Sequence, residues 1–391
     1  MSLKLHRGMD NIGYRGPRRN KFIHDKAHGH STYMPELQSI SAIIDKGDWK
    51  LKKVLSILEK IKSKYEVMNN GYFFSVKAKA LDHYGIPDKA VEVCNEALSK
   101  GLEDGVIFLV KAKAQSNMGK YKYAHETCVE AFKKGYQEVQ LFNMDVQALD
   151  GMGEYEAALK VCYEAIASEK YNEITLNMKA MVLNHMGRHE ESVRECKKII
   201  SGGTANVFTY TIMAYAFHNM GKDEKALEVC EKAIAAGYVD GGIYTAKAKI
   251  LDHTGQWNEA EKTYLYCIDT FGENFDVLEN LLEHYLAARE ENKAGETLDK
   301  ICKFNCRKIE NLNINEFDLS GVHFGKRLQE RDISKEKLLE SIGKSPMGYH
   351  KFSTMVCYSV IDDNIIKMIA NPDEKIIITV WKELKCAAKS G

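Results

Sequence analysis

A period of 34 residues runs through the middle of the chain and constrains its fold more than any other feature. Glycine recurs at this interval six times, and an arginine takes the seventh place. The glycine column is Gly85, Gly119, Gly153, Gly187, Gly221 and Gly255, followed by Arg289. Five residues after each stands a small residue: Ala90, Ala124, Ala158, Ser192, Ala226, Ala260 and Ala294. Two columns in phase over this length predict stacked copies of one supersecondary unit.

Each repeat predicts two helices of about a dozen residues joined at the glycine. Large apolar residues lie eleven and four positions before the glycine, at helical spacing, with Gln115 as the one polar exception. The glycine supplies the left-handed backbone that ends the first helix. A second column (Gly101, Gly135, Gly203 and Gly237, with Glu169 as its departure) ends the second helix.

The combination of a 34-residue period, an aromatic residue, the glycine and A-x3-(large apolar) resembles the tetratricopeptide repeat. The resemblance implies a mainly α fold, a right-handed α-solenoid of about seven helix-turn-helix units over residues 71–308. Residues 34–70 resemble a degenerate capping pair of helices. Cysteine replaces the family's usual aromatic residue, and the usual junction proline is absent.

Five of the ten cysteines form one repeat column: Cys94, Cys128, Cys162, Cys196 and Cys230. A buried stripe and a metal or redox ladder are the two interpretations. Neighbouring units stack ~10 Å apart, beyond the reach of a disulfide, which favours the buried stripe. Cys302 and Cys306 lie one helical turn apart, but no partnering pair follows at zinc-site spacing. We therefore predict no metal and no cofactor.

The first helix of each unit is expected to line the concave side of the solenoid. Its inward positions carry a recurring polar set, the predicted groove: Lys79, Asp82, His83, Lys113, Asp150, Asn184, His185, Tyr215, His218, Asn219, Lys249, Asp252 and His253. These residues predict a surface for an extended protein or peptide segment. Alternatively, they solvate the helix ends, where histidine interacts favourably with the helix dipole. Chaperone-binding relatives have a two-carboxylate clamp at set inward positions. The residues of this chain at the corresponding positions do not match that clamp.

Residues 1–33 form a basic arm with seven Lys or Arg and two Asp, a net charge of plus five. Such an arm can contact an acidic partner or nucleic acid. The alternative is a terminal segment that is disordered or packs without a charge-specific role.

The repeat register is lost near Asn311, and residues 312–391 predict a small α+β domain. Helices are expected over 322–331 and, after a Ser334 cap, to residue 342. Gly343, Pro346 and Gly348 predict a break. Three strands are then expected at 352–360, 365–369 and 375–381, joined as an antiparallel meander.

The pattern HxxxRLxERxIS before this meander resembles the RelE, barnase and colicin ribonuclease-toxin superfamily. The resemblance implies catalytic roles for His323, Arg327, Arg331 and Thr379, with His350 and Lys351 as nearby candidates. Such residues would supply a base, an acid and phosphate-binding cations. Against this, the domain from residue 313 has twelve Lys or Arg and eleven Asp or Glu, which is not the basic face of an RNA binder.

Composition excludes little else. Lys plus Arg and Asp plus Glu both number 55, so global charge favours neither nucleic acid nor an anionic membrane. No apolar run reaches the ~18 residues of a membrane span, so we expect a cytoplasmic protein, with secretion as an effector as the alternative. Two functions follow: a scaffold that binds a protein segment in its groove and presents the C-terminal domain, or a ribonuclease that uses the repeats for targeting. The sequence does not indicate an oligomeric state.

Overall fold

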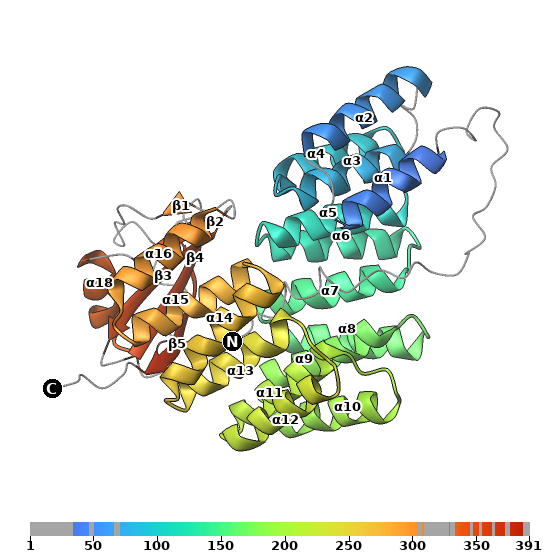
Figure 1. Cartoon of the computed structure of the whole chain (residues 1–391). Helices are drawn as coiled ribbons and strands as arrows, with labels where there is room; N and C mark the ends of the chain where they lie inside the picture. The colour runs from blue at the N-terminus through green and yellow to red at the C-terminus, as the bar shows by residue number, and fades with distance from the viewer. Residues whose placement is uncertain are drawn as a thin grey trace. The chain divides into compact units, whose positions relative to one another are not determined.

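Helix follows helix at the predicted period in the computed structural model of the chain (Figure 1). The structure describes residues 34–46, 51–65, 71–303, 307–308, 328, 333–344, 347–351, 354–361, 364–371 and 376–385. The basic arm and the predicted helix at 322–331, apart from Leu328, lie outside these residues. No helix in the described ranges is both long and apolar enough to cross a membrane.

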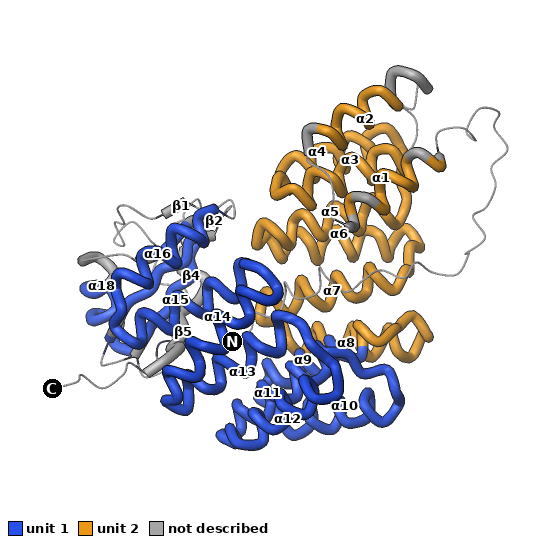
Figure 2. The backbone as a smooth tube through the Cα atoms, in the orientation of Figure 1, with its two compact units in different colours: residues 1–7, 176–391 blue, residues 8–175 orange. Residues whose placement is uncertain are grey.

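The chain forms two compact units, 8–175 and 176–391 together with 1–7 (Figure 2), and each is described by itself. The first contains α1 (Met34–Lys46), α2 (Leu51–Tyr65), α3 (Gly71–His83), α4 (Pro87–Ser99), α5 (Gly105–Asn117), α6 (Tyr121–Lys133), α7 (Val139–Met152) and α8 (Tyr155–Ala167). The boundary falls within α9 (Glu173–His185). The second unit continues with α10 (His189–Ser201), α11 (Val207–Asn219), α12 (Asp223–Ala235), α13 (Gly241–His253), α14 (Trp257–Phe271), α15 (Phe275–Ala287) and α16 (Glu291–Cys302).

The turn between paired helices has the predicted left-handed backbone. All six glycines of the first column have φ between 70° and 80°. The two departures from the glycine columns behave in the same way, with φ of 60° at Arg289 and 57° at Glu169. The repeat therefore imposes this conformation even where a side chain must tolerate it.

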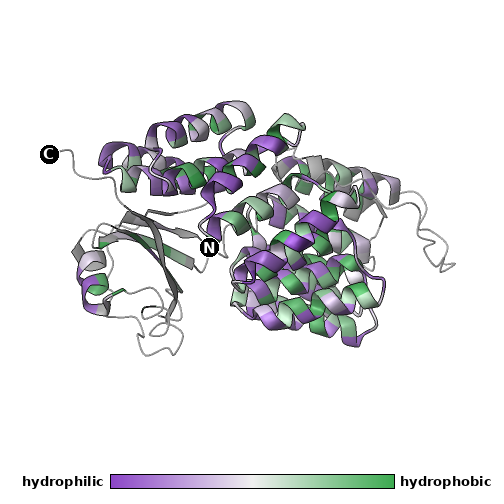
Figure 3. Cartoon of the chain, turned by 90° about the horizontal axis from the view of Figure 1, so that it is seen from below, coloured by the Kyte–Doolittle hydropathy of each residue, from purple (hydrophilic) through white to green (hydrophobic). Residues whose placement is uncertain are grey.

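Small side chains allow the helices of each pair to pack closely. The small-residue column and the cysteine column are fully buried wherever the repeat is regular, including Cys94, Cys162 and Cys230 at 0% exposure. This confirms the predicted buried stripe. Gln115, the polar exception, is also buried and accepts a hydrogen bond from Thr127 Oγ1 at 2.8 Å. Hydrophobic and hydrophilic residues alternate along the helices, as Figure 3 shows.

First helices lie closer to one another than second helices do. α3 packs against α5 and α5 against α7 in one unit, and α11 packs against α13 and α13 against α15 in the other. Among the described helices, no two successive second helices have comparable contacts. The first helices therefore form the inner side of each bend. We call the surface that they form the inner face.

The C-terminal part forms an antiparallel meander of five strands in sequence order: β1 (Arg307–Lys308), β2 (Met347–Lys351), β3 (Thr354–Ile361), β4 (Asn364–Asn371) and β5 (Ile376–Lys385). The three predicted strands correspond to β3, β4 and β5. The prediction that Gly348 belongs to a break is wrong, because it pairs with Cys357 in β2. The buried Tyr349 beside it explains why a strand forms there.

Helices lie against both faces of this sheet. α18 (Lys335–Lys344) covers one face, where Leu338 packs with Met355 and Met368. Ser334 caps this helix as predicted, accepting a hydrogen bond from the Lys337 backbone at 3.3 Å. The opposite face packs on α15, the first helix of the last repeat. The last repeat and the sheet therefore share one hydrophobic core.

Two helical glycines should respond in opposite ways to alanine. A Cβ on Gly151 would lie 2.7 Å from the Tyr121 ring, whereas a Cβ on Gly295 would meet nothing within 4 Å. We expect Gly151→Ala to destabilise the protein by about 1–3 kcal/mol through overpacking. Gly295→Ala should stabilise it by about 0.5–1 kcal/mol, because alanine favours the helix. Urea unfolding of both variants measures this, and equal shifts would contradict the packing at Gly151.

Candidate functional site

Polar side chains on the inner face of unit 8–175 are held across repeats by hydrogen bonds. Asn117 Nδ2 of α5 donates to both carboxylate oxygens of Asp82 in α3, at 2.8 and 3.1 Å. Lys113 and His83 are exposed beside this pair. Lys79 is half-buried and donates to Ser41 Oγ of α1 at 3.3 Å, and Asp150 is fully buried.

A similar row lies on the inner face of unit 176–391. Asn219 Nδ2 of α11 donates to Asn184 Oδ1 of α9 at 3.1 Å. His218 Nδ1 lies 2.5 Å from Asp223 Oδ1, and its ring lies 4.7 Å from that of His253, which is exposed. His185 and Tyr215 are half-buried. On the described inner faces, hydrogen bonds or ring contacts therefore hold Asp82, Asn184, His218, Asn219 and His253 of the predicted groove.

Four predicted groove residues are buried, namely Asp150, Asn184 and, in the last repeats, Lys249 and Asp252. Lys249 and Asp252 of α13 are only 3% and 1% exposed. Lys249 Nζ lies 3.8 Å from Glu283 Oε2, and His284 Nδ1 lies 2.6 Å from Asp252 Oδ1. Both partners belong to α15, so these two residues bind the neighbouring repeat.

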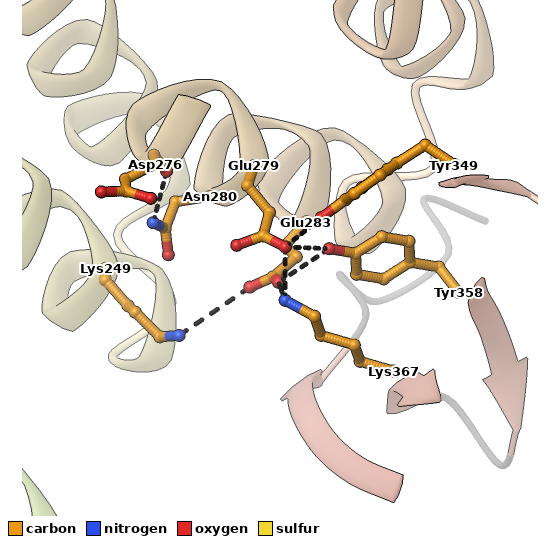
Figure 4. Close-up of polar contacts among 8 residues, drawn as sticks. All are labelled: Lys249, Asp276, Glu279, Asn280, Glu283, Tyr349, Tyr358 and Lys367. Atoms are coloured by element: carbon orange, nitrogen blue, oxygen red, sulfur yellow. Dashed lines mark hydrogen bonds and ion pairs between the residues drawn. The ribbon is translucent and has the colours of Figure 1, made fainter. Parts of the chain in front are cut away.

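Beside them, the sheet and α15 bury a compact polar cluster (Figure 4). Glu279 Oε1 accepts hydrogen bonds from Lys367 Nζ at 2.6 Å, Tyr349 Oη at 2.5 Å and Tyr358 Oη at 3.2 Å. Glu283 Oε1 lies 3.5 Å from Lys367 Nζ and 3.3 Å from Tyr358 Oη. All five residues are at most 5% exposed.

Groups of opposite charge are paired in this cluster. Lys367 lies against Glu279 and Glu283, and Lys249 lies against Glu283 at the distances given above. Buried charges are tolerated when they are paired and hydrogen-bonded in this way. No three His, Cys, Asp or Glu side chains of the described chain are grouped so that they could hold a metal ion. The ion pairs join the sheet to the last repeat, since Lys367 belongs to β4 and Glu279 and Glu283 belong to α15.

This cluster is not among the predicted sites, although the repeat contains a signal for it. Six positions before the turn stand Lys79, Lys113, Gln147, Met181, Tyr215, Lys249 and Glu283. Ten positions before it stand Ser75, Leu109, Asn143, Asn177, Thr211, Thr245 and Glu279. In both columns only the last repeat is acidic. This change to glutamate marks the repeat that binds an ammonium group.

Burial raises the pKa of the Asp252 carboxyl above its ordinary value, and the hydrogen bond from His284 only partly opposes this. The native state therefore binds a proton more readily than the unfolded state at pH values just above 3.8. As pH rises from there through the native pKa, the stability contributed by Asp252 falls. We expect the stability of Asp252→Asn relative to wild type to rise across the same interval. Parallel unfolding curves at pH 4 to 7 measure this, and a constant difference would contradict it.

The six residues of the ribonuclease prediction are not brought together by the described structure. His323, Arg327 and Arg331 lie outside the described residues. His350 and Lys351 are in β2 and Thr379 is in β5, with two strands between them, a separation of roughly 14 Å. The ribonuclease function stays a prediction from sequence.

Comparisons with known proteins agree with the repeat architecture. A family model described as the N-terminal TPR repeats region of Psidin matches residues 146–264. Comparison with curated proteins gives no match. A tetratricopeptide repeat protein from Parabacteroides merdae superposes with a TM-score of 0.54 and 18% identity, covering 64% of this chain and 98% of that one. The pentatricopeptide repeat protein PPR10 from maize gives a TM-score of 0.39 and 18% identity, covering 68% and 44%. At 18% identity, the similarity to the Parabacteroides merdae protein concerns the fold.

Proposed function

Since the helical array of this chain is a tetratricopeptide repeat solenoid, we propose that it is a scaffold for a partner protein. It binds a segment of the partner along its inner face and holds the C-terminal sheet at the last repeat. The concave surface of stacked helical repeats is suited to such extended ligands.

The observation that carries this proposal is the order of the polar rows on the inner face. Asn117 is hydrogen-bonded to Asp82 across one repeat junction, and Asn219 is hydrogen-bonded to Asn184 across another. Side chains that are already held in place lose little conformational entropy when a ligand binds. Exposed groups beside them, such as Lys113 and His253, then contribute contacts at defined positions.

Two inner-face variants and one outer-face control test the proposal. We expect the Lys113→Glu and His83→Glu variants to capture at least about tenfold less of a partner that the wild type retains. Each substitution adds a negative charge to the inner face. Lys160→Glu is the matched control, since this lysine lies on the second helix α8 with a side chain that is 78% exposed. Affinity capture from cell lysate with quantitative mass spectrometry provides the measurement.

A protein that is depleted by both inner variants and retained by the control would support the proposal. If the inner variants and the control retain the same proteins equally, partner binding along the inner face is wrong. Circular dichroism of each variant separates lost binding from lost folding.

A further inference from the structure

We propose that Glu279, Glu283 and Lys367 form a docking lock that specifies a single position of the C-terminal sheet on the last repeat. In this proposal the surrounding apolar side chains stabilise the contact between sheet and helix. The charged groups determine where the sheet packs on the last repeat. Lys367 is thus a positioning residue. The inference does not depend on any partner of the inner face, so it stands apart from the proposed function.

The apolar part of the contact is broad. Leu278, Leu281 and Leu282 of α15 share one buried core with residues of three strands, namely Tyr349, Val356, Tyr358, Ile365 and Ile369. Burial of such side chains is favourable but not directional. Same-face residues of a strand recur every ~7 Å, so a sheet displaced by two residues would present a similar aliphatic surface to the helix. Apolar packing alone therefore leaves the position of the sheet weakly specified.

A single lysine distinguishes the observed position of the sheet from displaced positions. Lys367 lies on β4 between Ile365 and Ile369 on the face that packs against α15, and it is 3% exposed. In a position displaced away from Glu279 and Glu283, its ammonium would be buried without a counter-charge. An unpaired buried charge is far more costly than a paired one, so displaced positions are disfavoured.

The two carboxylates that accept from Lys367 lie on one side of α15. Glu279 and Glu283 are four residues apart on α15 and therefore on the same side of the helix. Glu279 Oε1 also accepts hydrogen bonds from the hydroxyls of Tyr349 and Tyr358, so two further strands are tied to the same oxygen. Lys249 of α13 lies beside the second carboxylate, and the Asp252 and His284 pair lies on the same two helices.

The test separates position from stability with two variants of the full chain. Lys367→Met leaves two buried carboxylates with one remaining lysine, and we expect its Tm to fall by about 10 °C. The triple variant Glu279→Met, Tyr349→Phe, Lys367→Met removes the charge pair and the hydroxyl that would lose its acceptor. It keeps Glu283 with Lys249 and Tyr358, and its Tm should stay within about 4 °C of wild type. The exposed Lys337→Met on α18 is the matched control, with an unchanged Tm.

Position is then measured by photo-crosslinking from a benzophenone amino acid at residue 275. The Phe275 ring lies 5.4 Å from that of Tyr349, so the lock predicts a single crosslinked segment, β2, in wild type. The triple variant should crosslink to additional strands at comparable yield. A triple variant that is confined to β2 like wild type would overturn the proposal, as would a Tm for Lys367→Met that equals that of Lys337→Met.

Discussion

At pH 8, the thiols of Cys196 and Cys230 should react with iodoacetamide about 2,000-fold more slowly in the folded protein than a free cysteine thiol. Burial raises the pKa of both thiols to about 12. Only the thiolate reacts, and at pH 8 a thiol with that pKa is ionised to about one part in ten thousand. An ordinary thiol, with a pKa near 8.5, is ionised to roughly a quarter under these conditions.

Labelling followed by peptide mass spectrometry measures the rate at each cysteine. Cys302 is half-buried and provides an internal control that should react much sooner. In concentrated guanidinium chloride all cysteines should react at similar rates. If Cys196 and Cys230 in the folded protein were labelled as fast as Cys302, the cysteine column would not be the packed stripe described above.

Leu282→Ala should lower the free energy of unfolding by about 2–5 kcal/mol. Leu282 is 0% exposed and lies in the core that the last repeat shares with the C-terminal sheet. Its truncation removes apolar burial and leaves a cavity between a helix and a sheet that cannot easily collapse around it. The loss of stability should appear both in the last repeat and in the C-terminal sheet, since the two share one core.

Leu265→Ala is the matched control for this prediction. Leu265 lies on the adjacent helix α14 and is 42% exposed, so its truncation should change stability by less than about 0.5 kcal/mol. Urea denaturation monitored by circular dichroism and by tyrosine and tryptophan fluorescence measures both variants. Equal effects of the two substitutions would contradict a shared core at Leu282.

The repeat array was predictable because each of its signals acts over short distances in the chain. The turn glycines determine where helices end, and the buried columns recur within 34 residues. Arg289 and Glu169 were assigned to glycine columns from spacing alone, and both adopt the left-handed backbone that those columns require. Repetition makes such local signals reliable, since each column is read several times.

The candidate site was predicted only in part. The sequence placed a polar strip on the first helices, and several of its residues do lie in ordered rows, as Asn219 and Asn184 show. It also placed Lys249 and Asp252 in an open groove, whereas both are buried against α15. Nothing within their own repeat distinguishes them from Lys79 and Asp82, because residues 77–83 and 247–253 share the pattern Lys-Ala-Lys-x-Leu-Asp-His.

The sequence by itself determined the repeat period, the helix ends, the buried cysteine stripe and the three long strands of the C-terminal meander. Only the tertiary structure decided that the meander packs against α15 and that Lys367 meets Glu279, 88 residues away in the chain. Helix ends and strand alternation follow from backbone conformation and side-chain periodicity, which are local properties. The meeting of two buried charges depends on how separate elements pack, and no local pattern encodes that distance.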